Sequence, residues 1–162
     1  MSLAHQIFNM IPGTWRLYRT IPGTGTLNGY AIFEVNPNNP NEIFYSENGI
    51  FYFNNGKSLE ASKKYIYCLQ NNDIYVYDVN FALFHKFGIS DLDSVDGDER
   101  SDTPASPHVS FNSFNVWKED KFNICYEFDL DNNQEFNIIH DVKSPRVDYV
   151  SKTRFKRIKQ IF

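Results

Sequence analysis

Residues 14–35 form the stretch TWRLYRTIPGTGTLNGYAIFEV, and its alternation decides the fold class. In the first half, Trp15, Leu17 and Arg19 alternate with more polar neighbours. After a glycine-containing turn, every second position from Leu27 to Val35 is again apolar or small. Successive side chains of a β-strand point to opposite faces, so a period of two predicts two strands that each bury one face.

The same period of two recurs through most of the remaining chain. We expect further strands at residues 42–48, 49–53, 58–68, 74–79, 81–87, 109–117, 122–130, 135–142 and 148–158. Turn-forming segments such as Asn54-Asn55-Gly56 separate these strands and favour hairpins. Helical spacing occurs only at the N-terminus and ends at Pro12-Gly13, which predicts one short helix there.

The composition agrees with an all-β chain. Of the 162 residues, 17% are aromatic, whereas alanine and leucine are scarce, and aromatic residues suit the half-buried surface of a sheet. Nearly every connection is a hairpin, and closure removes exposed sheet edges, so we expect a single antiparallel lipocalin-like β-barrel of about 8–10 strands rather than a sandwich. One domain would span residues 1–162, with residues 1–12 as a helical plug and residues 88–107 as a mobile acidic loop.

Charge and hydropathy argue against several kinds of partner. The 16 basic and 20 acidic side chains give a net charge of −4, which disfavours a general nucleic-acid binder. No run approaches the ~20 apolar residues that a membrane span needs. The N-terminus lacks the pattern of a secretion signal, and Cys68 and Cys125 lack metal-type spacing, so we expect a cytoplasmic protein with two reduced thiols.

Short motifs along the chain follow one another in a recognisable order. They are Gly13-Thr14-Trp15-Arg16-Leu17-Tyr18-Arg19, Tyr45-Ser46-Glu47-Asn48-Gly49, Tyr65-Ile66-Tyr67, Tyr77-Asp78, Phe84-His85-Lys86-Phe87, His108, and Ser144-Pro145-Arg146-Val147-Asp148-Tyr149 with Thr153 and Arg157. In this order they resemble a calycin-type, lipocalin-like family of domains of unknown function, number 6314 in its series. The resemblance spans Gly13 to Arg157 and implies a barrel but no particular activity.

The chain departs from the pattern of that family at four positions. Ser144 replaces the expected glycine and Val147 the expected lysine. Ser110 and Ser113 stand where cysteine and aspartate are usual. If those positions serve a reaction in other members of the family, this chain has lost it.

The barrel interior is the predicted binding site, because a barrel of this size can hold one small ligand. The candidate ligand-binding residues are Trp15, Arg19, Tyr45, Glu47, Tyr65, Tyr67, His85, His108, Tyr149 and Arg157. Phe84, Phe87 and Phe155 would complete an aromatic wall. We therefore expect a small apolar or amphiphilic ligand that could carry an anionic group; the oligomeric state stays open.

Arg19 and Arg157 lie on the first and last strands, which closure of a barrel makes neighbours. We expect their guanidinium groups to converge, with Glu47 close to them. A charge inside a barrel is costly unless it is paired or faces ligand or water. Two interpretations stay open: a polar floor that anchors an anionic or carbonyl group, and arginines that face solvent or close the barrel through a structural Arg–Glu pair.

Other functions are compatible with the same barrel. An enzyme could use Glu47, His85 or His108 as acid–base groups. A small haem-binding barrel could use the histidines beside the acidic loop, His85 and His108. A barrel whose interior is filled by side chains would instead be a protein-interaction domain without a ligand. Apart from haem in that alternative, we expect no cofactor and no metal. His140 and Asp141 are neighbours in a strand and point to opposite faces, so they form no His–Asp pair.

Overall fold

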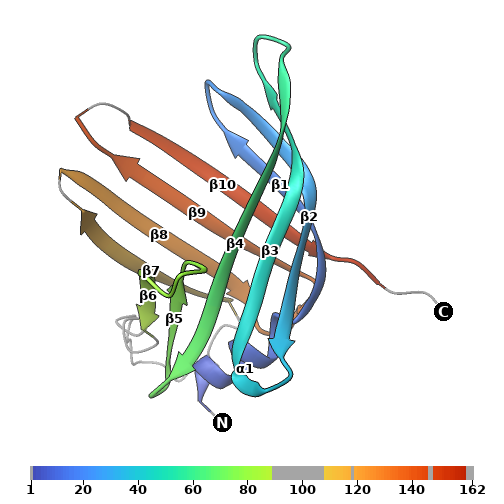
Figure 1. The fold of residues 1–162 in the computed structure, drawn as a ribbon, viewed down its shortest axis with the longest axis vertical. Helices are drawn as coiled ribbons and strands as arrows, with labels where there is room; N and C mark the ends of the chain where they lie inside the picture. Colours follow the sequence, from blue (N-terminus) through green and yellow to red (C-terminus); the bar gives the residue numbers. More distant parts are fainter. Residues whose placement is uncertain (1, 89–107, 118, 146–147, 160–162) are drawn as a thin grey trace.

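The computed structural model describes residues 2–88, 108–117, 119–145 and 148–159. One helix and ten strands follow the chain: α1 (Leu3–Met10), β1 (Gly13–Ile21), β2 (Gly25–Asn36), β3 (Asn39–Phe53), β4 (Ser58–Gln70), β5 (Asp73–Tyr77), β6 (Leu83–Gly88), β7 (His108–Trp117), β8 (Asp120–Asp129), β9 (Glu135–Lys143) and β10 (Asp148–Arg157). All ten strands belong to one antiparallel sheet in the order β6-β5-β4-β3-β2-β1-β10-β9-β8-β7 (Figure 1).

The sheet curls into a nearly closed barrel. β1 and β10, the first and last strands of the chain, pair in antiparallel register, with Trp15 opposite Arg157 and Arg19 opposite Thr153. β6 and β7, the outer strands of the sheet order, come close together across the remaining gap. The predicted antiparallel barrel with a short N-terminal helix is therefore confirmed.

Several strand boundaries differ from the prediction, and two of the differences follow from local structure. β3 is one continuous strand rather than two, because Gly29 and Gly49 lie opposite each other and let the sheet bend without a break. A Cβ atom at Gly49 would come within 2.4 Å of the Asn28 carbonyl oxygen, so only glycine permits this close approach. β5 ends earlier than predicted because Asp78 accepts hydrogen bonds from the main-chain N–H groups of Asn80 and Ala82 and forms a turn.

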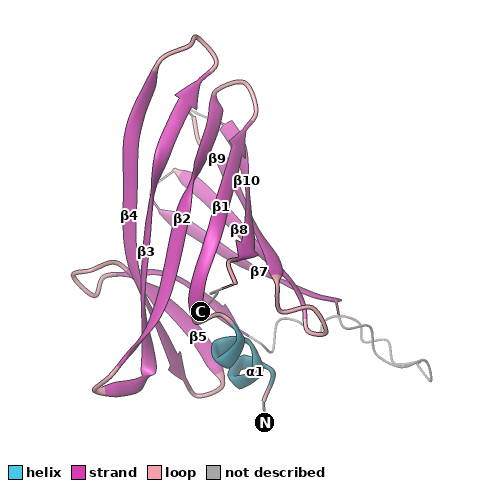
Figure 2. Ribbon diagram, turned by 90° about the vertical axis from the view of Figure 1, so that its right-hand side faces the viewer, coloured by secondary structure: helices cyan, strands magenta, loops and turns pink. Residues whose placement is uncertain are grey.

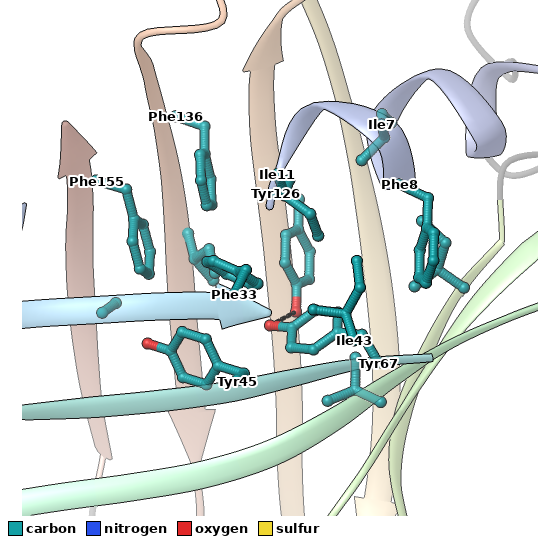
Figure 3. Close-up of a cluster of buried hydrophobic side chains, with 14 of the residues drawn as sticks. Ile7, Phe8, Ile11, Phe33, Ile43, Tyr45, Tyr67, Tyr126, Phe136 and Phe155 are labelled. Carbon is teal, nitrogen blue, oxygen red and sulfur yellow. Dashed lines mark hydrogen bonds between the residues drawn. The ribbon is translucent and has the colours of Figure 1, made fainter. Parts of the chain in front are cut away.

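Helix α1 covers one end of the barrel (Figures 1 and 2). Ser2 caps it by accepting a hydrogen bond from the His5 main-chain N–H. Its buried side chains are Ala4, Ile7 and Phe8, which pack into the hydrophobic core (Figure 3). We call this end of the barrel the closed end.

Above the helix, four inward-facing aromatic residues form a layer that fills the barrel. Trp15, Phe33, Phe136 and Phe155 are each at most 3% exposed. The rings of Phe136 and Phe155 stack with centroids 4.4 Å apart, and Trp15 meets Phe136 edge-on at 4.8 Å. We call these four residues the aromatic layer. Trp15 comes from β1, and Phe33, Phe136 and Phe155, which are labelled in Figure 3, come from β2, β9 and β10.

Several expectations concern parts of the chain away from this layer. Apart from Gly88, the predicted acidic loop of residues 88–107 lies outside the described residues, as does the side chain of Phe87. Cys68 and Cys125 are free thiols, as expected. No helix within the described ranges has the length and apolar character required to cross a membrane.

Candidate ligand-binding site

A group of polar side chains lies inside the barrel on the side of the aromatic layer that faces away from α1. Alternate residues of a strand point to the same face, so Trp15, Leu17 and Arg19 of β1 all point into the barrel. Tyr45 and Glu47 of β3 point inward for the same reason. We call the inward-facing polar residues at this level the polar layer. Its members are Arg19, Tyr45, Glu47, Lys63, Tyr67, His85, Tyr126, His140 and Thr153.

A bidentate ion pair is the centre of the polar layer. The Arg19 Nη1 atom lies 2.8 Å from Glu47 Oε2 and Nη2 lies 3.0 Å from Oε1. Arg19 Nε donates to Thr153 Oγ1 at 2.7 Å, and the Tyr45 hydroxyl donates to Glu47 Oε1. Both oxygens of the carboxylate are thus occupied, and Glu47 is only 3% exposed.

The surroundings of this pair keep both groups charged. Burial alone would raise the pKa of Glu47, but the hydrogen bonds and charge of Arg19, with the Tyr45 hydroxyl, hold it below its usual range. Burial opposes the charge of Arg19 as well, yet the hydrogen bond and charge of Glu47 leave the pKa of Arg19 raised. A carboxylate held in this way is a weak proton acceptor at neutral pH.

A chain of hydrogen-bonding groups lies beside the ion pair. His85 Nε2 is 2.7 Å from the Tyr126 hydroxyl. The Tyr126 hydroxyl is in turn 3.4 Å from the Tyr67 hydroxyl, a contact that Figure 3 shows. Burial, followed by the nearby His140, lowers the pKa of His85 to about 3. Burial also raises the pKa of both tyrosines. All three groups are therefore neutral at pH 7.

Four members of the polar layer were not predicted as site residues: Tyr126 and Thr153, described above, and Lys63 and His140. Lys63 of β4 stands opposite Glu47 in the strand register, and His140 of β9 stands opposite Ser151. Burial, then the charges of Lys63 and Arg19, lower the pKa of His140 to about 4. Strand parity could have found both residues, because Lys63 shares a face with Tyr65 and Tyr67, and His140 shares one with Ile138.

The polar layer surrounds a small cavity of about 30 Å³. This volume suits one or two water molecules, so side chains fill most of the barrel interior. Lys63 lines the cavity and is also an exposed residue, which connects the cavity to solvent. Tyr65 and Phe84, both partly buried, stack at 5.2 Å on the cavity wall.

The structure gathers six of the ten candidate residues around this cavity: Arg19, Tyr45, Glu47, Tyr65, Tyr67 and His85. Trp15 lies below them in the aromatic layer, fully buried. Tyr149 is the second residue of β10 and is 39% exposed. Arg157 and His108 lie elsewhere, which changes two expectations.

Arg157 does not converge with Arg19. It pairs in register with Trp15, four residues before Arg19, and therefore lies at the closed end. Its Nη2, Nη1 and Nε atoms donate to the carbonyl oxygens of Met10, Pro12 and Asn133 at 2.5, 2.9 and 2.9 Å. The guanidinium also lies 4.2 Å from the centroid of the Trp15 ring. Arg157 thus fastens α1 and the β8–β9 turn to the barrel wall.

His108 likewise lies apart from Glu47 and His85. Its side chain is 74% exposed, and its Nε2 atom is 3.9 Å from an Asp129 carboxylate oxygen. His108 pairs in the strand register with Asp129 of β8. Asp129 comes three residues after Tyr126, the residue that His85 contacts, so His108 lies beyond the polar layer. Of the three candidate acid–base groups, Glu47 and His85 line the same cavity, whereas His108 lies outside it.

The described residues around this cavity do not fit a metal ion or a haem group. Within the described ranges, no cluster of three or more metal-ligating side chains occurs. The cavity beside His85 is far smaller than a haem macrocycle, and His85 Nε2 already faces the Tyr126 hydroxyl. His140 lines the cavity while Asp141 lies on the other face near Lys143, so the two form no dyad.

Solved β-barrels resemble this structure. The S-type phycobiliprotein lyase CPES from Guillardia theta has a TM-score of 0.62 and 11% sequence identity, with 99% of this chain and 95% of the lyase covered. The barrel EF1p2_mFAP2b bound to DFHBI has a TM-score of 0.48 and 11% identity, with 97% and 100% covered. The redesigned barrel mFAP1 bound to DFHBI has a TM-score of 0.45 and 12% identity, with 94% and 99% covered.

At 11% identity, the likeness to the lyase shows the fold alone. A search of the curated proteins found no match. The model of a family of unknown function (DUF6314) matches residues 11–157, the same region over which the short motifs occur. By this match, which covers most of its length, the chain belongs to the DUF6314 family.

Proposed function

We propose that this barrel binds a small amphiphilic ligand at the end opposite α1. The polar group of the ligand would enter the polar layer, and its apolar part would lie against the stacked rings of Tyr65 and Phe84. One observation carries the proposal: a buried ion pair, an additional lysine and two neutral histidines surround a cavity that reaches solvent.

The cost of burying charge supports a binding role for this layer. Replacing a buried ion pair by apolar residues of similar volume is often neutral or stabilising. The aromatic layer shows that this chain can fill the barrel with stacked rings. The buried charges of Arg19 and Glu47 are therefore a costly way to fill a barrel, and recognition of a polar group gives them a purpose.

The size of the cavity constrains how the ligand would bind. A volume of about 30 Å³ admits a carboxylate-sized group but no apolar body. The apolar part must therefore lie outside the cavity, on the partly buried faces of Tyr65 and Phe84. Burial of apolar surface would supply most of the affinity, and the polar layer would set orientation.

Native mass spectrometry of the purified protein tests this function, followed by titration with dodecanoate and dodecan-1-ol. We expect a one-to-one complex with an amphiphile. Tyr65→Ala should weaken binding about tenfold or more, because it removes apolar wall. Tyr30→Ala is the matched control, since Tyr30 is 51% exposed on the outer face. A protein that arrives free of ligand and binds neither compound would overturn the proposal.

A further inference from the structure

The polar layer carries one positive charge that nothing in it neutralises. Arg19 and Glu47 cancel each other through their bidentate contact. His85 and His140 are neutral at pH 7 because burial lowers the pKa of each well below 6. Lys63 remains, and it makes no ion pair with any residue in the described part of the chain.

The hydrogen bonds of Glu47 explain why Lys63 has no carboxylate partner there. Lys63 stands directly opposite Glu47 on the neighbouring strand, a position from which oppositely charged side chains usually meet. Arg19 and Tyr45 already occupy the Glu47 oxygens. Lys63 therefore lines the cavity beside a carboxylate that already accepts three hydrogen bonds from other side chains.

We propose that the polar group of the ligand is a carboxylate, and that the Lys63 ammonium binds it in the cavity of the polar layer. This inference rests on the proposed function and names the chemical class of its ligand. A carboxylate would neutralise the surplus charge and give Lys63 the partner it lacks. A neutral hydroxyl or carbonyl group would leave that charge uncompensated in a partly desolvated site.

The electrostatic surroundings of Lys63 agree with this assignment. Burial of part of its side chain, then the charge of Arg19, lower the pKa of Lys63, while Glu47 acts in the opposite direction. The charge of Lys63 also contributes to the lowered pKa of His140 on the facing β9 strand. The Tyr65 hydroxyl and the neutral His140 ring line the same cavity and can donate further hydrogen bonds to a carboxylate.

Lys64 provides a matched control. It is the next residue of β4, pairs with Ser46 and points to the outer face of the barrel. Lys63 and Lys64 are both exposed, so replacing either by methionine should leave the fold intact, which circular dichroism and thermal unfolding check. Only the substitution at position 63 removes a charge from the cavity.

The experiment measures binding of dodecanoate and dodecan-1-ol by calorimetry at pH 7.5. We expect the unmodified protein to prefer dodecanoate, Lys63→Met to weaken dodecanoate binding about tenfold or more with dodecanol unchanged, and Lys64→Met to change neither. Lys63→Arg should restore much of the preference. Equal binding of both compounds, or equal effects of Lys63→Met and Lys64→Met, would overturn the carboxylate assignment. Absence of binding by either compound would instead overturn the proposed function.

Discussion

Two arginines on neighbouring strands lie at different levels of the barrel, and they have different kinds of hydrogen-bond partner. Arg157, at the closed end, donates to three main-chain carbonyl oxygens and stacks on Trp15. Arg19, in the polar layer, donates to the Glu47 carboxylate and the Thr153 hydroxyl. One has partners that belong to the backbone; the other has side-chain partners beside a cavity.

The difference separates a stabilising role from a binding role. Main-chain carbonyl groups cannot be exchanged or titrated, so the contacts of Arg157 are a fixed part of the fold. Gly13 leaves room for the Arg157 guanidinium, because a Cβ atom at this position would lie 2.6 Å from Arg157 Nη1. The contacts of Arg19 involve an ionised side chain, next to a second cation and a cavity, where a ligand can alter the balance of charge.

The largest effect is expected at the closed end. Trp15→Ala should lower the free energy of unfolding by ~3–5 kcal/mol, because Trp15 is fully buried and holds Phe136, Arg157 and the Ile11 carbonyl. Urea denaturation measures this, with the exposed Tyr18→Ala as control. A loss below ~1 kcal/mol would show that the closed end is not the main support of the barrel.

The next effect should come from the ion pair of the polar layer. Glu47→Gln removes the negative charge from a mostly buried guanidinium and should cost ~2–3 kcal/mol in urea denaturation. The double variant Arg19→Met, Glu47→Met removes both charges and should recover most of that loss. If the double variant is as unstable as the single one, the pair stabilises the fold in the same way as the closed end does.

A smaller effect is expected from Arg157→Met. It leaves three carbonyl oxygens without this donor, but the site is partly exposed, so we expect a loss of ~1–2 kcal/mol. Dodecanoate binding, measured by calorimetry on the folded variant, should be unchanged because Arg157 lies away from the cavity. Selective weakening of dodecanoate relative to dodecanol would place Arg157 in the binding site and remove the contrast with Arg19.

The smallest effect expected from a single residue is a dependence of the free energy of unfolding on pH. Burial lowers the folded-state pKa values of His85 and His140 to about 3 and about 4, below the ordinary histidine value of about 6.5. Stability from these groups is thus complete above about pH 6.5 and is lost as pH falls, because the unfolded chain takes up protons first. Between pH 6.5 and 5.5 we expect each of the two histidines to contribute a loss of about 1 kcal/mol.

Urea denaturation at several pH values checks this slope. His140→Gln should flatten it, while His108→Gln should not, because the His108 side chain is mostly exposed. The lowered pKa of Glu47 also makes the protein less stable as pH falls, but only at more acidic pH, near and below the ordinary pKa of a glutamate. A slope that stays the same in His140→Gln would show that this residue carries no part of the acid sensitivity.

The face on which a residue lies could be predicted from the sequence, whereas its height in the barrel could not. Alternation assigned Trp15, Arg19, Tyr45 and Glu47 to the interior, and all four lie there. The same alternation assigned Arg157 to the interior, but no local pattern states that it stands level with Trp15 rather than Arg19. The level of a residue along the barrel depends on the register between neighbouring strands. That register is determined by many hairpins together.

Composition and period two therefore determined, by themselves, an antiparallel barrel with an aromatic interior and one terminal helix, because these depend on local backbone geometry and on the burial of alternate side chains. Only the tertiary structure decided which charges meet. Arg19 finds Glu47 across 28 residues, and Arg157 finds Met10 across 147. Such contacts depend on register and curvature, and these decided that Lys63, rather than Arg157, stands beside the cavity.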